Sequence, residues 1–199
     1  RSEVFFLSYA ASFRGTSMMK AAWKNIAWFR WLQGDLAGYH TAMARCGRSG
    51  STFLDEDKDS QKEVESGTPP NRYLLKARLL CDGGYYSEAM KALKDVPADS
   101  FPSVRDKLEL TYRFARILQL AGHDDQAVTY YDKTIRNGSN TTFYFAANSA
   151  LMMGQLYEKK RDFAKARAYY EKCLSMRNHD YQNGLDQKAK AGLKRVGGR

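Results

Sequence analysis

Apolar and polar residues follow a helical pattern along most of this chain. From Glu3 to Arg14 and from Leu185 to Val196 they alternate at helical spacing, which predicts a helix near each end. Long stretches contain no proline, the residue that most strongly interrupts a helix. The four prolines are Pro69, Pro70, Pro97 and Pro102. Charged residues break every apolar run before it reaches the roughly 18–20 residues that cross a bilayer, so the pattern predicts an all-helical chain without a membrane span.

The clearest internal pattern lies in residues 147–178. A small residue, Gly154, is followed three positions later by Tyr157 and twelve positions later by a second small residue, Ala166, with Tyr170 beyond it. The same combination of small and large residues recurs upstream. The pairs of small residues twelve positions apart are Ala77 and Ala89, Ala115 and Ala127, and Gly154 and Ala166. A repeated pattern of this kind predicts a repeated structural unit.

This spacing resembles the tetratricopeptide repeat family. The resemblance implies an all-α fold, a right-handed α-α superhelix in which stacked helical hairpins share one continuous core. We expect a single domain over 1–199, in which Tyr131 and Tyr170 fill the space between successive hairpins. The expected repeats are 20–46, 70–97, 108–136 and 147–178, with an inserted acidic segment at 47–70 and a capping helix at 185–196. The copy at 20–46 is the weakest, because Tyr39 stands where the family has a small residue.

The inserted segment 47–70 begins with a stretch rich in glycine and serine and ends at two consecutive prolines. Between these ends, the letters LDEDKDSQKEVES predict a solvated helix. The acidic cluster at its start suggests a calcium loop, but the turn glycine and closing glutamate of such a loop are missing at the required spacing. The members of this cluster are Asp55, Glu56, Asp57 and Asp59. We therefore assign them to a solvated helix N-terminus, where acidic side chains complement the helix dipole.

The sequence carries no pattern of a catalytic or metal site, so we expect no enzyme activity, no cofactor and no bound metal. The three cysteines share no C-x-x-C spacing and are expected to be small core residues. They are Cys46, Cys81 and Cys173. The histidines lie far apart, outside any H-E-x-x-H motif, and no glycine loop for phosphate binding is present. Of these, His123 and His179 are expected in loops.

Net charge is +10, with the basic excess toward the two ends of the chain. A basic cluster surrounds the expected turn of the last repeat. Its members are Lys159, Lys160, Arg161, Lys165 and Arg167. This cluster either contacts phosphates or an acidic partner, or forms an ordinary solvated face. The sequence pI of about 9.5 keeps nucleic-acid binding by a helical repeat as an alternative function.

The family resemblance implies that the chain binds a protein or an extended peptide in a concave groove lined by the first helix of each repeat. The residues at the lining positions are Asn71, Leu74, Arg78, Glu109, Tyr112, Arg116, Gln119, Asn148, Leu151, Gln155 and Glu158. The weaker first copy adds Lys24, Trp28 and Trp31. Arginine and aromatic side chains suit a segment with some acidic character. Some family members grip a C-terminal carboxylate with a Lys/Asn/Arg set, which this chain does not fully reproduce, so such a clamp is not predicted.

Compartment and pathway stay open at the level of sequence. Because the sequence begins at Arg1 and not at Met, we expect a trimmed or processed N-terminus. The long repeat period, the acidic insertion and the D-G-G-Y-Y turn resemble longer tetratricopeptide proteins of bacteria such as the Bacteroidetes, in which export to the periplasm is common. Periplasmic and cytoplasmic locations are therefore both retained, and no oligomeric state is indicated.

Overall fold

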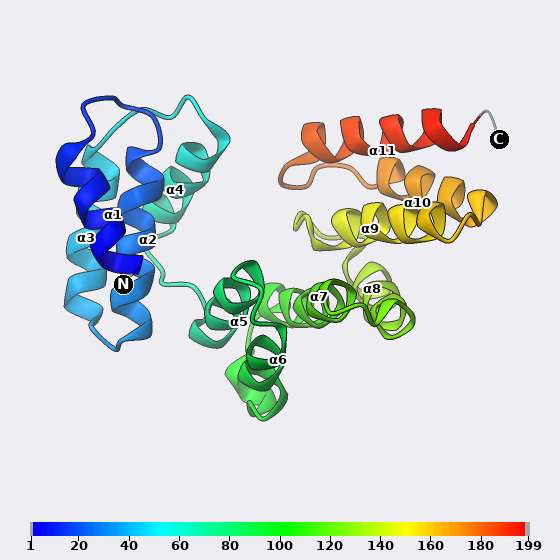
Figure 1. Cartoon of the computed structure of the whole chain (residues 1–199), viewed down its shortest axis with the longest axis horizontal. Helices are drawn as coiled ribbons and strands as arrows, with labels where there is room; N and C mark the ends of the chain where they lie inside the picture. The colour runs from blue at the N-terminus through cyan, green and yellow to red at the C-terminus, as the bar shows by residue number, and fades with distance from the viewer. Residues whose placement is uncertain (1, 198–199) are drawn as a thin grey trace. The chain divides into compact units, whose positions relative to one another are not determined.

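The computed structural model describes residues 2–197, and all regular secondary structure in this range is helical (Figure 1). The α-helices are α1 (Ser2–Ser12), α2 (Met19–Leu32), α3 (Leu36–Arg48), α4 (Asp55–Ser66), α5 (Arg72–Asp82), α6 (Tyr86–Lys94), α7 (Val104–Leu120), α8 (Asp124–Gly138), α9 (Phe145–Lys159), α10 (Phe163–Ser175) and α11 (Gln182–Val196). A short 3-10 helix spans Ala98–Ser100. Neighbouring helices pack against one another as in a helical-repeat superhelix, which confirms the predicted fold class.

The chain divides into two compact units, Arg1–Leu75 and Lys76–Arg199, which are described separately. The single repeat domain expected over 1–199 stays a prediction. Within the described range, no helix combines the length and the apolar character needed to cross a bilayer.

Four pairs of helices are joined by the same tight turn, namely α2–α3, α5–α6, α7–α8 and α9–α10. In each turn one residue has a left-handed backbone, and the next residue donates its N–H to a carbonyl five positions earlier, as His123 does to Leu118 at 2.8 Å. This bond closes the last turn of the first helix. The left-handed residues are Gly34 (φ 86°), Gly84 (φ 83°), Gly122 (φ 85°) and Arg161 (φ 62°). Glycine adopts this conformation without steric cost, so Arg161 is the exception among them.

In the first unit, α1, α3 and α4 all pack against α2. The small residue Ala27 of α2 has no exposed surface. The side chain of Asp35 caps α3 by accepting the N–H of Gly38 at 2.7 Å. An ion pair of 3.1 Å between Glu3 and Arg30 links α1 to α2. The first unit is therefore one helical hairpin with a helix before it and a helix after it.

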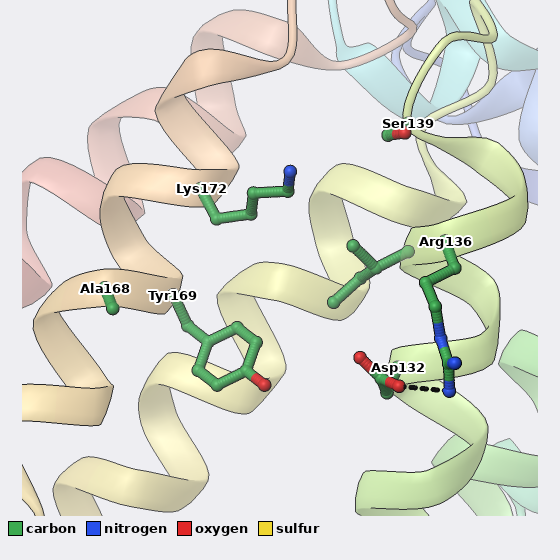
Figure 2. A pocket seen from close by; sticks show the side chains of 7 residues that line it. Asp132, Arg136, Ser139, Ala168, Tyr169 and Lys172 are labelled. Atoms are coloured by element: carbon green, nitrogen blue, oxygen red, sulfur yellow. Dashed lines mark ion pairs between the residues drawn. The ribbon is translucent and has the colours of Figure 1, made fainter.

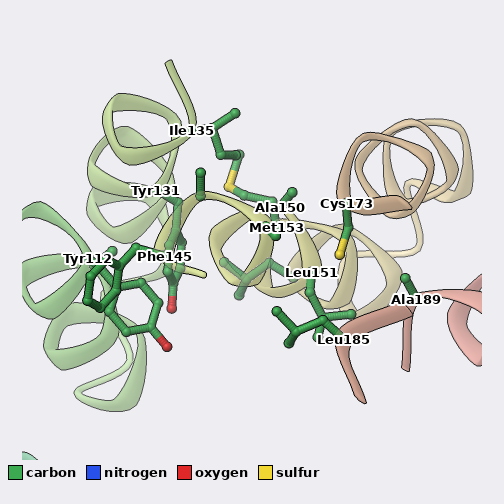
Figure 3. Packing of buried hydrophobic residues seen from close by; sticks show 14 of the residues in the cluster. Tyr112, Tyr131, Ile135, Phe145, Ala150, Leu151, Met153, Cys173, Leu185 and Ala189 are labelled. Atoms are coloured by element: carbon green, nitrogen blue, oxygen red, sulfur yellow. The ribbon is translucent and has the colours of Figure 1, made fainter. Parts of the chain in front are cut away.

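In the second unit, consecutive helices from α6 to α11 pack against one another, and α9 also contacts α7 and α11. Tyr131 and Tyr170 have no exposed surface. A Cβ atom added to Gly154 would lie 2.6 Å from the ring of Tyr170, and one added to Gly192 would overlap the same ring. The ring therefore fills the space between α9 and α11, as predicted for the large residues of the repeat. Figure 3 shows the buried residues that surround α9, with Tyr131 on one side and Cys173 on the other.

The turn at Arg161 provides a stability test. We expect Arg161→Gly to raise the free energy of unfolding by about 0.5–1 kcal/mol, because relief of the left-handed strain exceeds the entropy cost of glycine. Chemical unfolding followed by circular dichroism measures the change.

The matched control is Arg167→Gly, the same change at an exposed position inside α10. Glycine in a helix interior is unfavourable, so this variant should lose about 1 kcal/mol. Destabilisation by both variants would contradict the assignment of strain to Arg161.

Candidate functional site

The predicted lining residues of α7 and α9 adjoin one another in the second unit. The side-chain amide of Asn148 donates to the hydroxyl of Tyr112 at 2.7 Å. Arg116 donates to Gln119 Oε1 at 2.9 Å, and its guanidinium also lies 3.2 Å from the sulfur of Met152 on α9. These contacts join the first helices of two successive hairpins into one surface, called here the first-helix face.

One hydrogen bond recurs in both of these hairpins. Tyr131 of α8 donates to Gln119 of α7, and Tyr170 of α10 donates to Glu158 of α9, each at 2.5 Å and each across twelve residues. Burial raises the pKa of both phenols, to about 12 for Tyr131, and the bond to Glu158 raises that of Tyr170 further. The hydroxyls therefore remain protonated donors at physiological pH. They fix the orientation of Gln119 and Glu158 on the first-helix face.

The carboxylates on the first-helix face are paired with arginines. Glu109 is buried and accepts from Arg113 at 2.8 and 3.1 Å, while Arg105 lies 3.1 Å from its other oxygen. Glu158 accepts from Arg195 of α11 at 2.7 and 2.9 Å. A ligand on this face thus meets neutralised carboxylates.

The apolar residues predicted to line the groove lie in the core. Leu151 and Tyr112 are 1% and 5% exposed, and Leu74 is 2% exposed, so their apolar groups stabilise the fold and present little surface to a partner. Gln155 is exposed. Asn71 caps the start of α5 by accepting the N–H of Tyr73 at 3.1 Å.

Arg78 lies 3.7 Å from Asp82 in an exposed ion pair. Arg78 belongs to the second unit, whereas Asn71 and Leu74 belong to the first. A role in binding for any of the eleven predicted residues stays a prediction.

In the first unit, the inserted segment contacts two of the predicted lining residues, Trp28 and Trp31. Lys24 and Trp28 are buried. The indole N–H of Trp28 donates to Glu63 of α4 at 2.7 Å, and that of Trp31 donates to the carbonyl of Pro70 at 2.9 Å. The inserted segment therefore lies where a ligand of the weaker first copy was expected.

Asp57 corrects the expectation that the acidic cluster is solvated. It has no exposed surface and accepts the backbone N–H groups of Met18 at 2.7 Å and Ala21 at 3.2 Å. These groups lie at the N-terminus of α2, which has no side-chain cap of its own. Asp57 thus caps α2 from another helix. Sequence pattern does not reveal this role, because an acidic residue in the first turn of α4 is already favourable within α4 itself.

Two hollows lie between the second helices of the hairpins, on residues that no sequence motif marks. One, of about 490 Å³, separates α8 from α10 and is lined by Asp132, Arg136, Tyr169 and Lys172 among others (Figure 2). Asp132 and Arg136 form an ion pair at its edge. The other, of about 640 Å³, lies between α6 and α8 over the side of α7 and is mostly apolar.

Cys46, Cys81 and Cys173 are free and buried, as predicted for core residues. Burial raises the pKa of the thiol to about 11 in Cys46 and about 12 in Cys173, which disfavours the nucleophilic thiolate. His123 and His179 lie outside the helices, as predicted. Over residues 2–197, no group of three or more His, Cys, Asp or Glu side chains has an arrangement suited to a metal ion.

Residues 147–180 match the family model of the tetratricopeptide repeat. This is the stretch in which the sequence pattern is clearest, and the match confirms the resemblance there. No curated protein shows significant similarity to the chain. Among solved structures, the crystal structure of BtubC (BKLC) from P. vanneervenii is similar over 99% of this chain and 86% of that chain, with 19% sequence identity and a TM-score of 0.45. A likeness at this TM-score supports no inference about function.

The contact between Asp57 and α2 yields a stability prediction. Asp57→Ala should destabilise the first unit by about 2 kcal/mol, because two buried N–H groups lose their acceptor. All three tryptophans, Trp23, Trp28 and Trp31, lie in that unit, so tryptophan fluorescence during urea unfolding reports on it.

The control is Asp55→Ala, which removes an exposed carboxylate two positions away that pairs only with Lys58 on the same helix. It should leave the urea midpoint nearly unchanged. Equal effects of the two variants would mean that Asp57 contributes only charge to α4.

Proposed function

Because residues 147–180 carry a tetratricopeptide repeat, we propose that the chain is a non-enzymatic scaffold that binds another protein or an extended peptide. Stacked helical hairpins suit this role, since they present an extended surface built from the same positions of successive repeats. The proposed surface is the first-helix face of α7 and α9 in the second unit.

One observation carries this proposal: the two first helices meet through polar side chains. The contacts of Asn148 with Tyr112 and of Arg116 with Met152 make a continuous surface across two hairpins. Asn148 and Arg116 remain partly exposed, and Gln155 is exposed beside them. An extended peptide offers backbone N–H and C=O groups along its length, and these three side chains can donate to or accept from such groups.

The charges on this face favour a partner with acidic side chains. Glu109 and Glu158 are each held by arginines, as described above. Arg116 itself donates to two neutral side chains, those of Gln119 and Met152. A carboxylate of the partner can therefore bind Arg116 without displacing an ion pair, and arginine binds carboxylates with good geometry.

Nucleic-acid binding, the alternative, has weaker support. On the first-helix face, Arg105, Arg113 and Arg195 are already paired with Glu109 and Glu158, which leaves few basic side chains to contact a row of phosphates. Lys159 and Lys160 lie 3.3 and 2.6 Å from Asp124 and Asp125 in exposed ion pairs, so part of the basic cluster is already neutralised.

Binding should depend on Arg116. The probe is a peptide selected on the whole chain from a display library of short random sequences. Arg116→Ala should weaken its binding by about 2 kcal/mol, roughly 30-fold, because a central arginine in an interface costs this much when truncated. Titration calorimetry gives the affinity, and circular dichroism checks that the variant is folded.

The control for charge is the double change Lys159→Ala and Lys160→Ala at the exposed ion pairs. It should alter the salt dependence and leave the affinity nearly unchanged. If this pair abolishes binding while Arg116→Ala does not, the basic turn is the binding surface and the first-helix face is not.

Single-stranded RNA and DNA should show no appreciable binding at physiological salt, because Arg105, Arg113 and Arg195 of the first-helix face are already paired with carboxylates. Fluorescence anisotropy with labelled homopolymeric oligonucleotides measures this. Sub-micromolar affinity with a steep dependence on salt would favour the nucleic-acid alternative.

A further inference from the structure

The hollow between α6 and α8 has the dimensions of a binding site. Its volume of about 640 Å³ falls in the range of pockets that hold ligands, about 300–1,000 Å³. Its walls come from two successive second helices, and its floor is formed by the side of α7. It lies entirely within the second unit. We call it the second-helix groove.

Apolar and aromatic side chains form the centre of the second-helix groove. Met90 of α6, Phe114 and Ile117 of α7 and Tyr130 of α8 all line it. The rings of Phe114 and Tyr130 stack with centroids 5.2 Å apart. Met90, Phe114 and Tyr130 are each only partly buried. Apolar surface left open in this way on a folded domain is typical of a site where another molecule binds.

Positive and polar groups surround this apolar centre. Lys94 and His123 line the groove, and Tyr130 also belongs to an adjoining hollow that contains Lys133 and Arg136. Among the described residues that line either hollow there is no carboxylate. The acidic residues of α8 are themselves paired, Asp124 and Asp125 with lysines of α9 and Asp132 with Arg136. A partner that carries negative charge around an apolar side chain therefore complements the groove.

The first unit contains an example of such a contact within the chain. The acidic helix α4 packs on α2, where the indole N–H of Trp28 donates to Glu63. A helical hairpin of this protein thus already holds an acidic segment against an aromatic side chain.

We propose that the second-helix groove binds a short acidic segment of a partner protein, which inserts one large apolar side chain between Met90, Phe114 and Tyr130. Carboxylates beside that anchor lie against Lys94 in the groove and against Lys133 in the adjoining hollow. The surface is separate from the first-helix face, so the chain has two docking sites that can be tested independently. Binding by an apolar anchor in a groove between helices gives affinity, and the flanking charges give specificity.

The experiment is a selection from a phage-displayed library of short random peptides on the immobilised full-length chain. The Lys94→Glu variant is present in solution as a competitor, so that it removes peptides that do not depend on Lys94. Peptides that bind the chain and not the competitor should be net negative and should carry a Leu, Met, Phe or Trp anchor. For one such peptide, Met90→Ala and Lys94→Glu should each weaken binding at least about tenfold, because one removes anchor contacts and the other repels its carboxylates. A peptide in which lysine replaces the acidic residues should regain affinity for Lys94→Glu.

Two controls keep the surfaces apart. Lys172→Glu makes the same charge change in the hollow between α8 and α10, and Arg116→Ala changes the first-helix face. Neither variant should change the affinity for these peptides. Loss of binding to Arg116→Ala alone would place the peptides on the first-helix face and overturn the second-helix groove while supporting the proposed function.

Three other outcomes overturn the proposal. The first is a selection that yields no peptide sensitive to Lys94→Glu, and the second is one whose peptides lack acidic residues. The third is concentration-dependent self-association of the chain in analytical ultracentrifugation that is lost in both Lys94→Glu and Phe53→Ser. Phe53 is 85% exposed next to the acidic cluster, so that result would make a second copy the occupant.

Discussion

The second unit depends on the burial of one tyrosine from each of the second helices α8 and α10 against neighbouring first helices. A single helical hairpin leaves an apolar stripe in water, and only the next hairpin can cover it. Tyr131 and Tyr170 occupy this position, and both end in a hydroxyl that needs a partner once buried. Gln119 and Glu158 supply it, each from the first helix of the same hairpin. Burial of the ring and pairing of its hydroxyl therefore determine together how the two helices of a hairpin are oriented.

Much of this arrangement can be predicted from the sequence, because it repeats. The helical spacing of apolar residues, the small residues twelve positions apart and the glycines in the turns are local signals, and each predicted helix is present. Arg161 illustrates the limit of such signals: its left-handed backbone is recognised only because the other three turns carry glycine in the same place.

Contacts between distant parts of the chain were not predictable in the same way. The side chain of Asp57 reaches α2 across more than thirty positions, and the acidic run around it matches an ordinary exposed helix equally well. Leu151 stands at a position that lines a groove in the family resemblance, but here it is closed off by its neighbours. The site could therefore be predicted only as a set of positions on the first helices. Which of their side chains remain accessible depends on ion pairs that join successive helical turns or different helices. Arg105 and Arg113 pair with Glu109 within α7, and Arg195 of α11 pairs with Glu158 of α9.

The ring of Tyr170 also bears on how this sequence can change over evolutionary time. Gly154 and Gly192, on two different helices, both lie against the ring, and neither has room for a methyl group. A mutation to alanine at either glycine is tolerated only after the tyrosine has become smaller, and a smaller residue at 170 leaves a cavity until a glycine is replaced. The three positions, separated by sixteen and twenty-two residues, therefore evolve as one unit. Among descendants of this sequence their identities should covary, and the order in which the substitutions arise should be constrained.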